Sequence, residues 1–231
     1  MLLLIWGYCG MKYLRCKEEI EWWREHLTIR DTYVKNRCAG IKFDQTLKDL
    51  IKNKPHFIDR KRLKIADFGC GPVSVVGTLD DTYDIDILGI DPLIDEYNKI
   101  LEEKNLTRPH DVRLMECEDA HFLGADKFDI VFSRNAIDHS ERPDEILMSG
   151  KHICKPNGLF HIRMYEYEGQ NQNYEGIHQW NFFLENNNVS VASPTYGRKF
   201  TVKDILGDNI SITTQDTFKS AKEICISYFK E

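Results

Sequence analysis

The chain has 231 residues, of which 42% are hydrophobic, and its formal net charge is −6 at pH 7. This length predicts a single domain that buries a substantial core, and the acidic balance argues against a surface built to coat nucleic acid. The seven cysteines are scattered, odd in number and without a Cys-x-x-Cys pair, which predicts a reducing, cytoplasmic location and no structural zinc.

The N-terminal region is apolar and then helical in pattern. The stretch from Met1 to Met11 is too short to span a bilayer and lacks the basic start of a signal peptide. We therefore expect no membrane span and no targeting role. From residue 17 to 54 apolar residues recur at helical spacing. Such helices either pack on the core or cover a ligand site; we assign residues 17–58 to a helical cap, lined by Tyr33 and Arg37.

The central region alternates between strand and helix patterns. Strands are predicted near 64–68, 85–90, 111–116, 127–133 and 158–165, and helices near 73–79, 93–103 and 142–151. This alternation is typical of a doubly wound, mainly parallel α/β sheet of the Rossmann-like type. Residues 60–165 would form this core.

The last part of the chain, residues 166–231, has strand patterns of another kind. Gln179 to Leu184 and Val189 to Ser193 flank an Asn-rich turn and predict a β-hairpin insertion after the fifth strand. Val202 to Leu206 predicts a short helix. Asn209 to Thr214 and Glu223 to Phe229 predict the final strands, which would bring the sheet to seven.

The most informative motif is Ile65-Ala66-Asp67-Phe68-Gly69-Cys70-Gly71-Pro72, with Asp91 at the end of the next predicted strand. Gly69 and Gly71 allow a tight turn and close approach of a ligand, and Pro72 suits the first turn of a following helix. In a doubly wound sheet both places meet at the carboxyl edge, where an acid binds ribose hydroxyls. A dinucleotide and S-adenosylmethionine are both candidates. The dinucleotide fingerprint requires a third glycine, where this chain has Ser74.

Three later motifs favour the second ligand. They are Glu118-Asp119-Ala120, the run from Phe128 to Ser133, and Pro156-Asn157-Gly158. Together with the glycine motif, their order and spacing resemble the class I S-adenosylmethionine-dependent methyltransferases. The resemblance implies that S-adenosylmethionine is the cofactor and that the final strand inserts antiparallel beside the fifth.

The resemblance also implies a role for each motif residue. Asp67 would reach the methionine amino group, Gly69 and Gly71 would give a backbone surface, and Asp91 would accept both ribose hydroxyls as parallel bonds. Pro92 would touch the adenine face, and Asp119 and Ala120 would bind the adenine edge. Asn135, after the fourth strand, is also assigned to the cofactor.

The segment from Ser133 to Ser140 lies where class I enzymes place acceptor-side groups. Amino methyltransferases carry an Asn/Asp-Pro-Pro-Tyr-like motif there, and this chain has Asn135-Ala136-Ile137-Asp138 instead. A hydroxyl acceptor needs a base near neutrality, usually histidine. His139 is such a candidate, oriented by Asp138, although a packing histidine is the alternative.

A second cluster follows the fifth strand and contains the rival base, His178. Aromatic rings beside amides and acids suit a sugar, so Tyr165, Gln179 and Trp180 join Asp138 as candidate acceptor-binding residues. A buried hairpin explains the same residues equally well. The two segments together resemble small methyltransferases of bacterial surface-polysaccharide pathways. Asp138, His139 and His178 could also bind a metal, but no close ligand spacing is present, and we expect none.

Three functions remain open from the sequence. The first is O-methylation of a small molecule, a sugar or glycan precursor such as a nucleotide sugar. The second is N-methylation of RNA or protein, which would need a basic groove beginning at the run Arg60-Lys61-Arg62. The third is a non-catalytic subunit that binds S-adenosylmethionine.

Overall fold

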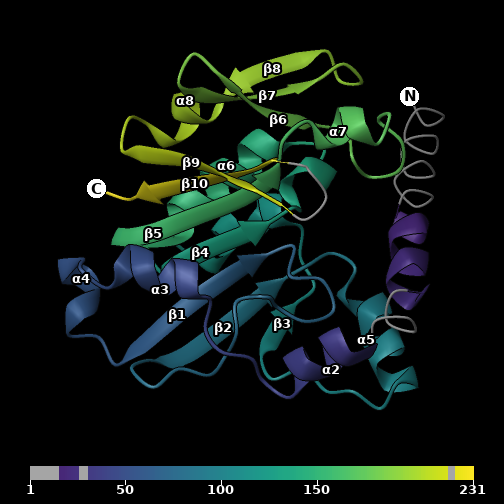
Figure 1. Cartoon of the computed structure of the whole chain (residues 1–231), viewed down its shortest axis with the longest axis vertical. Coiled ribbons are helices and arrows are strands. Elements are labelled where there is room, and N and C mark those ends of the chain that lie inside the picture. The colour runs from purple at the N-terminus through teal and green to yellow at the C-terminus, as the bar shows by residue number, and fades with distance from the viewer. Residues whose placement is uncertain (1–15, 26–30, 218–221) are drawn as a thin grey trace.

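The computed structural model describes residues 16–25, 31–217 and 222–231, so the apolar Met1–Met11 stretch lies outside it. A seven-stranded sheet forms its centre, with strand order β3-β2-β1-β4-β5-β10-β9 (Figure 1). The strands are β1 (Arg62–Phe68), β2 (Asp84–Ile90), β3 (Asp111–Arg113), β4 (Phe128–Arg134), β5 (Cys154–Tyr165), β9 (Ile210–Asp216) and β10 (Lys222–Phe229).

The sheet is mainly parallel. β1 pairs in parallel with both β2 and β4, β2 with β3, and β4 with β5. β10 runs antiparallel to both β5 and β9. The strand order reverses at β1 and β4, so the carboxyl ends of these strands form the edge where α/β sheets bind ligands. The predicted doubly wound fold and the antiparallel final strand are confirmed.

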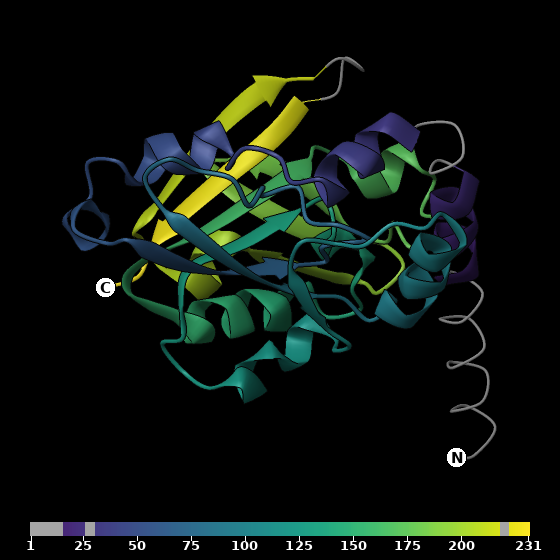
Figure 2. The same cartoon turned by 90° about the horizontal axis from the view of Figure 1, so that it is seen from below.

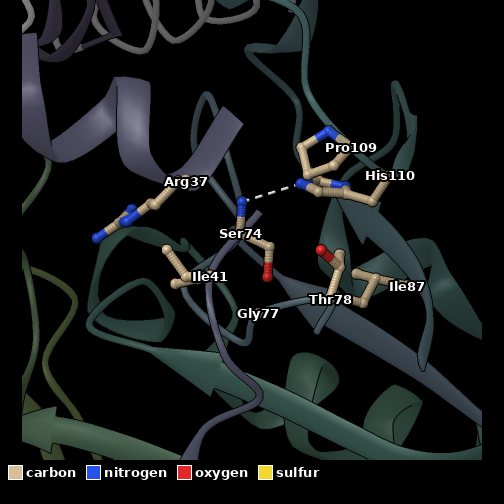
Figure 3. A pocket seen from close by; sticks show the side chains of 8 residues that line it. All are labelled: Arg37, Ile41, Ser74, Gly77, Thr78, Ile87, Pro109 and His110. Atoms are coloured by element: carbon tan, nitrogen blue, oxygen red, sulfur yellow. Dashed lines mark hydrogen bonds between the residues drawn. The ribbon is translucent and has the colours of Figure 1, made fainter. Parts of the chain in front are cut away.

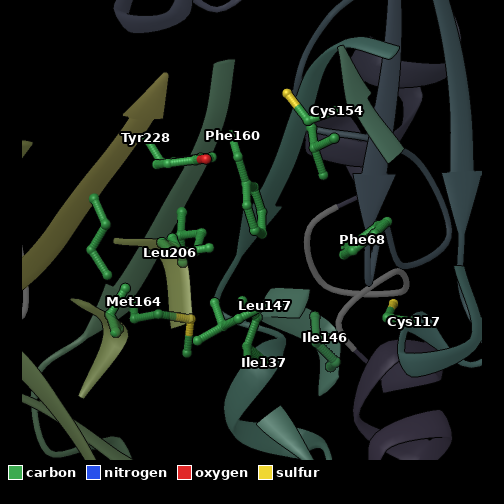
Figure 4. Packing of buried hydrophobic residues seen from close by; sticks show 14 of the residues in the cluster. Phe68, Cys117, Ile137, Ile146, Leu147, Cys154, Phe160, Met164, Leu206 and Tyr228 are labelled. Carbon is green, nitrogen blue, oxygen red and sulfur yellow. The ribbon is translucent and has the colours of Figure 1, made fainter. Parts of the chain in front are cut away.

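Helices cover both faces of the sheet (Figure 2). β1 shows why: its Leu63 and Ile65 point into one apolar cluster, while Ala66 and Phe68 point into the other. The first cluster packs under α3 (Gln45–Ile51) and α4 (Pro55–Ile58). The second packs against α6 (Pro143–Ile153) and α8 (Val202–Leu206). Figure 4 shows part of it, with Phe68 and Phe160 facing Ile146 and Leu147.

A third apolar cluster lies beyond β2 and joins the N-terminal helices to the core. It contains Val34 of α2 (Asp31–Cys38) and Tyr97 of α5 (Ile94–Glu103), with Trp23 of the helical residues 16–25 packed against it. The ring centroids of Trp23 and Tyr97 are 6.1 Å apart. This packing places residues 16–25 beside the carboxyl edge of the sheet.

A second sheet follows β5 and the short helix α7 (Glu168–Asn171). It consists of β6 (Asn181–Glu185), β7 (Asn188–Ser193) and β8 (Arg198–Thr201), all antiparallel. Asn186 and Asn187 both have positive φ, as a two-residue hairpin turn of the primed kind requires. The predicted hairpin is therefore present, and β8 extends it to three strands.

The helix predicted near 73–79 is wrong. A Cβ on Gly77, whose φ is +84°, would lie 2.2 Å from the carbonyl oxygen of Lys42. The amides of Thr78 and Leu79 both donate to Ile41 at 3.0 Å. The segment is thus an irregular loop held by distant backbone, and Pro72 begins no helix. The predicted third strand is also shorter, since β3 ends at Arg113.

Candidate active site

The glycine turn lies between β1 and the segment that follows β4. Gly69 and Gly71 have φ values of +66° and +61°. A Cβ on Gly69 would lie 2.2 Å from the Cβ of Ala136, so only glycine permits this approach. The turn that was expected to hold the cofactor therefore touches the segment that was expected to hold the acceptor.

Asp91 ties the turn to the end of β2. Its Oδ2 accepts from the Gly71 amide at 2.9 Å, and its Oδ1 accepts from the Leu93 amide at 2.9 Å. Burial raises the pKa of Asp91 to about 6, against the lowering effect of these two bonds. Each oxygen keeps a second lone pair for a vicinal diol. Pro92 follows directly and is half-buried, as a residue against a flat ring would be.

Asp67 ends β1 and is only 2% exposed. Burial raises its pKa to about 7, although a hydrogen bond from Ser74 and the charge of Arg37 act to lower it. Its Oδ2 has no hydrogen-bond partner among the described residues. Such a buried acceptor fits the ammonium group of a methionine moiety. The role of Ser74 was missed from the sequence, where only its departure from glycine was noted.

Arg37 is the predicted cap residue that reaches this site. It is 6% exposed and donates from Nη1 to the Val73 carbonyl at 3.1 Å. It also borders a crevice with about 160 Å³ of empty volume behind the glycine turn (Figure 3). The crevice is too narrow to admit a water molecule, so it is no site for the acceptor. The side chain of Tyr33 lies outside the described part of the chain.

Asp119 and Ala120 lie on the 3-10 helix η1 (Cys117–Leu123). The Cys117 thiol lies 3.7 Å from the Ile90 carbonyl oxygen, which holds η1 at the end of β2. Asp119 is half-buried and Ala120 is fully buried. The structure therefore brings this predicted adenine-edge pair to the same edge as Asp91.

Asp138, in the 3-10 helix η2 (Ile137–His139), is the centre of the acceptor side. It is fully buried, and its Oδ2 accepts from His178 Nδ1 at 2.7 Å. His139 Nε2 lies 3.6 Å from the same oxygen. Burial would raise the pKa of Asp138, but the two imidazoles outweigh it and hold the pKa below its usual value.

The imidazole rings of His178 and His139 pack against each other beside the Asp138 carboxylate. Their ring centroids are 4.5 Å apart and the rings are nearly perpendicular. Burial would lower the pKa of His178, but the hydrogen bond and charge of Asp138 leave it above its ordinary value. The structure thus joins both predicted bases to one buried acid across 40 residues of sequence.

Two other candidate acceptor residues, Gln179 and Trp180, differ in what they can offer a ligand. Gln179 is buried beside Asp138, and its amide nitrogen donates to the carbonyls of Tyr174 and Gly176 at 2.8 and 2.9 Å. Trp180 is fully buried, donates to the Ser140 carbonyl at 2.8 Å and stacks on Tyr196. Its ring therefore offers no face to an acceptor, and the buried-hairpin alternative holds for Trp180.

Two further candidates lie at strand ends: Tyr165, expected to bind the acceptor, and Asn135, expected to bind the cofactor. Tyr165 ends β5, opposite Glu223, and is half-buried. Asn135 follows β4 with φ +48°, and its amide donates to the Arg163 carbonyl at 2.8 Å. Its Oδ1 is buried and has no partner among the described residues. Asn135 is therefore held by its backbone with its side-chain oxygen available to a ligand.

The histidine cluster also has the composition of a metal site. One ligand atom from each of Asp138, His139 and His178 lies within 4.8 Å of the others. The hydrogen bond between His178 Nδ1 and Asp138 Oδ2 already occupies two of the atoms that an ion would need. The expectation of no metal stays a prediction.

Comparison with known proteins decides the class. A family model described as a methyltransferase domain matches residues 66–162, the region that contains the glycine turn, Asp91 and the segment after β4. The chain therefore contains a methyltransferase domain over residues 66–162. The methyltransferase uses S-adenosylmethionine, and the unpartnered Asp67 oxygen, the Asp91 carboxylate and the two glycines fit that cofactor. The predicted class and cofactor are confirmed.

Solved structures share the fold of the methyltransferase. Phosphoethanolamine N-methyltransferase 2 of Haemonchus contortus, in complex with S-adenosylhomocysteine, is 13% identical with a TM-score of 0.52; the match covers 80% of this chain and 52% of that one. A Burkholderia thailandensis 1,6-didemethyltoxoflavin-N1-methyltransferase is 12% identical with a TM-score of 0.48, over 97% and 90% of the two chains. No curated protein sequence matches this chain. No helix among the described residues is long and apolar enough to cross a membrane.

Proposed function

We propose that the methyltransferase transfers a methyl group to a hydroxyl of a small polyhydroxylated molecule, a sugar or glycan precursor in surface-polysaccharide synthesis. The observation that carries the proposal is the hydrogen bond of 2.7 Å between His178 Nδ1 and Asp138 Oδ2. Amine acceptors can lose a proton to water, whereas a hydroxyl needs a positioned base. A histidine held by a buried carboxylate supplies one.

His178 fits the role of base better than His139. With Nδ1 bound to Asp138, its Nε2 is the acceptor nitrogen, as in other carboxylate-oriented histidines. His139 instead directs its Nε2 toward Asp138, and that atom is buried. We therefore assign the base to His178 and a supporting position to His139.

The reaction needs one proton transfer and one methyl transfer. S-adenosylmethionine supplies a methyl group already activated on its sulfonium. His178 Nε2 would take the hydroxyl proton while the acceptor oxygen bonds to the methyl carbon. The bond from that carbon to sulfur would break, and S-adenosylhomocysteine would leave. Asp138 stabilises the imidazolium, which later releases its proton to solvent. The contact between Gly69 and Ala136 supports this alignment, because it holds the cofactor turn directly against the acceptor segment.

The rival functions have less support. N-methylation of RNA or protein would need an open basic groove, but Arg60 lies 3.1 Å from Asp129 and Arg62 lies 2.8 Å from Asp86. A non-catalytic subunit would not need a buried acid paired with a histidine. The six described cysteines are all free, which supports a reducing, cytoplasmic location.

A panel of acceptors tests the proposal. Purified protein with S-adenosylmethionine would be incubated with monosaccharides, nucleotide sugars, RNA and a peptide mixture, and products would be identified by mass. We expect a gain of one methyl group on oxygen of a sugar. Methylation of RNA or peptide alone, or cofactor binding without turnover on any acceptor, would contradict it.

A further inference from the structure

The helical residues 16–25 join the two halves of the site. A Cβ on Gly71 would lie 3.2 Å from the Trp23 ring, and a Cβ on Gly176 would lie 3.0 Å from the Glu18 carboxylate. Gly71 belongs to the cofactor turn, and Gly176 accepts from the buried Gln179 of the acceptor segment. This helix therefore covers the gap between cofactor and acceptor, and it carries glutamates on that side.

The buried atoms that have no partner among the described residues define what the ligand must offer. On the acceptor side these are Asp138 Oδ1, Gln179 Oε1 and His139 Nε2. The assignment of the Gln179 oxygen is fixed, because its amide nitrogen donates to two carbonyls. Both oxygens can only accept. A ligand that donates hydrogen bonds relieves their desolvation, and one that brings further acceptors does not.

The charges around Asp138, His139 and His178 also favour a ligand that carries hydrogen-bond donors. Glu168 and Glu19 both act to raise the pKa of His178, and Glu19 also raises that of Asp91. Glu19 is fixed by a hydrogen bond of 2.7 Å from Trp23. Two cations of the same edge, Arg134 and Arg163, have acidic partners.

Those acidic partners are Glu223 and Asp44. Arg134 and Arg163 both donate to Glu223, at 3.3 Å and 2.6 Å, and Arg163 Nη1 also lies 3.6 Å from Asp44 Oδ2. Arg37 lies near Asp67. The acceptor side is therefore acidic and rich in acceptor atoms.

We propose that the acceptor is an amino sugar, a polyhydroxylated molecule with an ammonium group, and that sugars with carboxylate or phosphate beside the reacting hydroxyl are excluded. This inference rests on the proposed function and narrows its substrate class. The ammonium group meets Glu168 and Glu19, and the hydroxyls donate to Asp138 and Gln179. An anionic sugar would face the same carboxylates and would find no unneutralised cation among the described residues named above.

Calorimetry on the protein saturated with S-adenosylhomocysteine tests the inference. The probes are glucosamine, glucose and glucuronic acid, which are a cation, a neutral molecule and an anion of similar size. We expect affinity to fall in that order. The inference would be overturned if glucuronic acid bound as tightly as glucosamine. It would also be overturned if the three sugars bound equally, or if none of them bound.

A pair of variants identifies the source of the preference. Glu168→Gln should lower the affinity ratio of glucosamine to glucuronic acid by about five- to tenfold, as expected for one partly screened charge. Glu175→Gln makes the same change on an exposed position of the same segment and should leave the ratio unchanged. Equal effects of both variants would contradict a local charge at the site.

The two proposals can fail separately. Methyl transfer to glucuronic acid at the rate of glucosamine would defeat this inference and leave the hydroxyl-transfer proposal standing. Preferential binding of glucosamine, with the methyl group found on nitrogen, would defeat the hydroxyl proposal and leave this one.

Discussion

The cofactor side and the acceptor side of the methyltransferase are built differently. The cofactor side is held by backbone: Asp91 accepts amide hydrogens from Gly71 and Leu93. The acceptor side is held by side chains from two distant segments that meet at Asp138. The glycine turn tolerates few substitutions, because Gly69 and Gly71 have positive φ, whereas the acceptor side can change its ligand by substitution of side chains. The first is therefore the general part of the molecule and the second the specific part.

The largest expected effect is on turnover, in a variant at His178 that impairs the acceptor side and leaves the cofactor side intact. His178→Ala should lower turnover by about 10²- to 10⁴-fold, because the acceptor proton loses its base, while affinity for S-adenosylhomocysteine stays constant. Steady-state kinetics and calorimetry measure the two quantities. His152→Ala, on an exposed histidine of α6, is the control. If His139→Ala lost turnover and His178→Ala kept it, the roles of the two histidines would be reversed.

The converse experiment is at Asp91. Asp91→Ala should weaken affinity for S-adenosylhomocysteine by at least about tenfold, since hydrogen bonds to a charged group contribute about 1.5–3 kcal/mol each. The loss also removes the acceptor of the Gly71 amide, so the turn itself loosens. Asp95→Ala, in the first turn of α5, controls for charge. An unchanged dissociation constant in Asp91→Ala would place the ribose elsewhere.

A smaller effect comes from the buried Asp67. Its pKa of about 7 means that it is mostly uncharged at pH 6 and charged at pH 8. The charged form binds an ammonium group, so affinity for S-adenosylhomocysteine should rise by about tenfold between these pH values. Calorimetry at several pH values, with Asp67→Asn for comparison, measures this. The same slope in both proteins would assign the titration to another group.

The smallest expected effect is that of chelation. Because Asp138 and His178 already satisfy each other, removal of divalent ions with EDTA should leave turnover unchanged. Metal content and rate would be measured before and after dialysis. A loss of rate that Mn²⁺ or Zn²⁺ restores would show that Asp138, His139 and His178 hold an ion, and the base assignment would be wrong.

The sequence predicted the cofactor side well because its signals are local. The apolar run before Asp67, the two glycines and Asp91 lie on consecutive strands, and their meeting follows from the sheet topology. The helix at 73–79 failed because its apolar spacing is real but Gly77 is held against Lys42, a contact 35 residues away that no local pattern reports.

The acceptor side was harder for the same physical reason. Asp138 and His178 were both singled out, but nothing in 40 residues of intervening sequence says that they share a hydrogen bond. Trp180 looked equally suited to a sugar and to a core, and only its packing on Tyr196 decides for the core. Glu19 gave no signal at all, since a glutamate on an amphipathic helix is usually solvated.

Glu223 gives this edge an evolutionary flexibility that its reacting centre lacks. The buried Glu223 carboxylate pairs with two guanidinium groups at the ends of neighbouring strands, those of Arg134 and Arg163, and Asp44 lies 3.6 Å from Arg163. A change of Glu223 to a neutral residue would leave Arg134 without its acid at the rim, while Arg163 would keep Asp44. The molecule thus carries a latent anion-binding surface, and one substitution would produce a variant that can bind an anionic substrate.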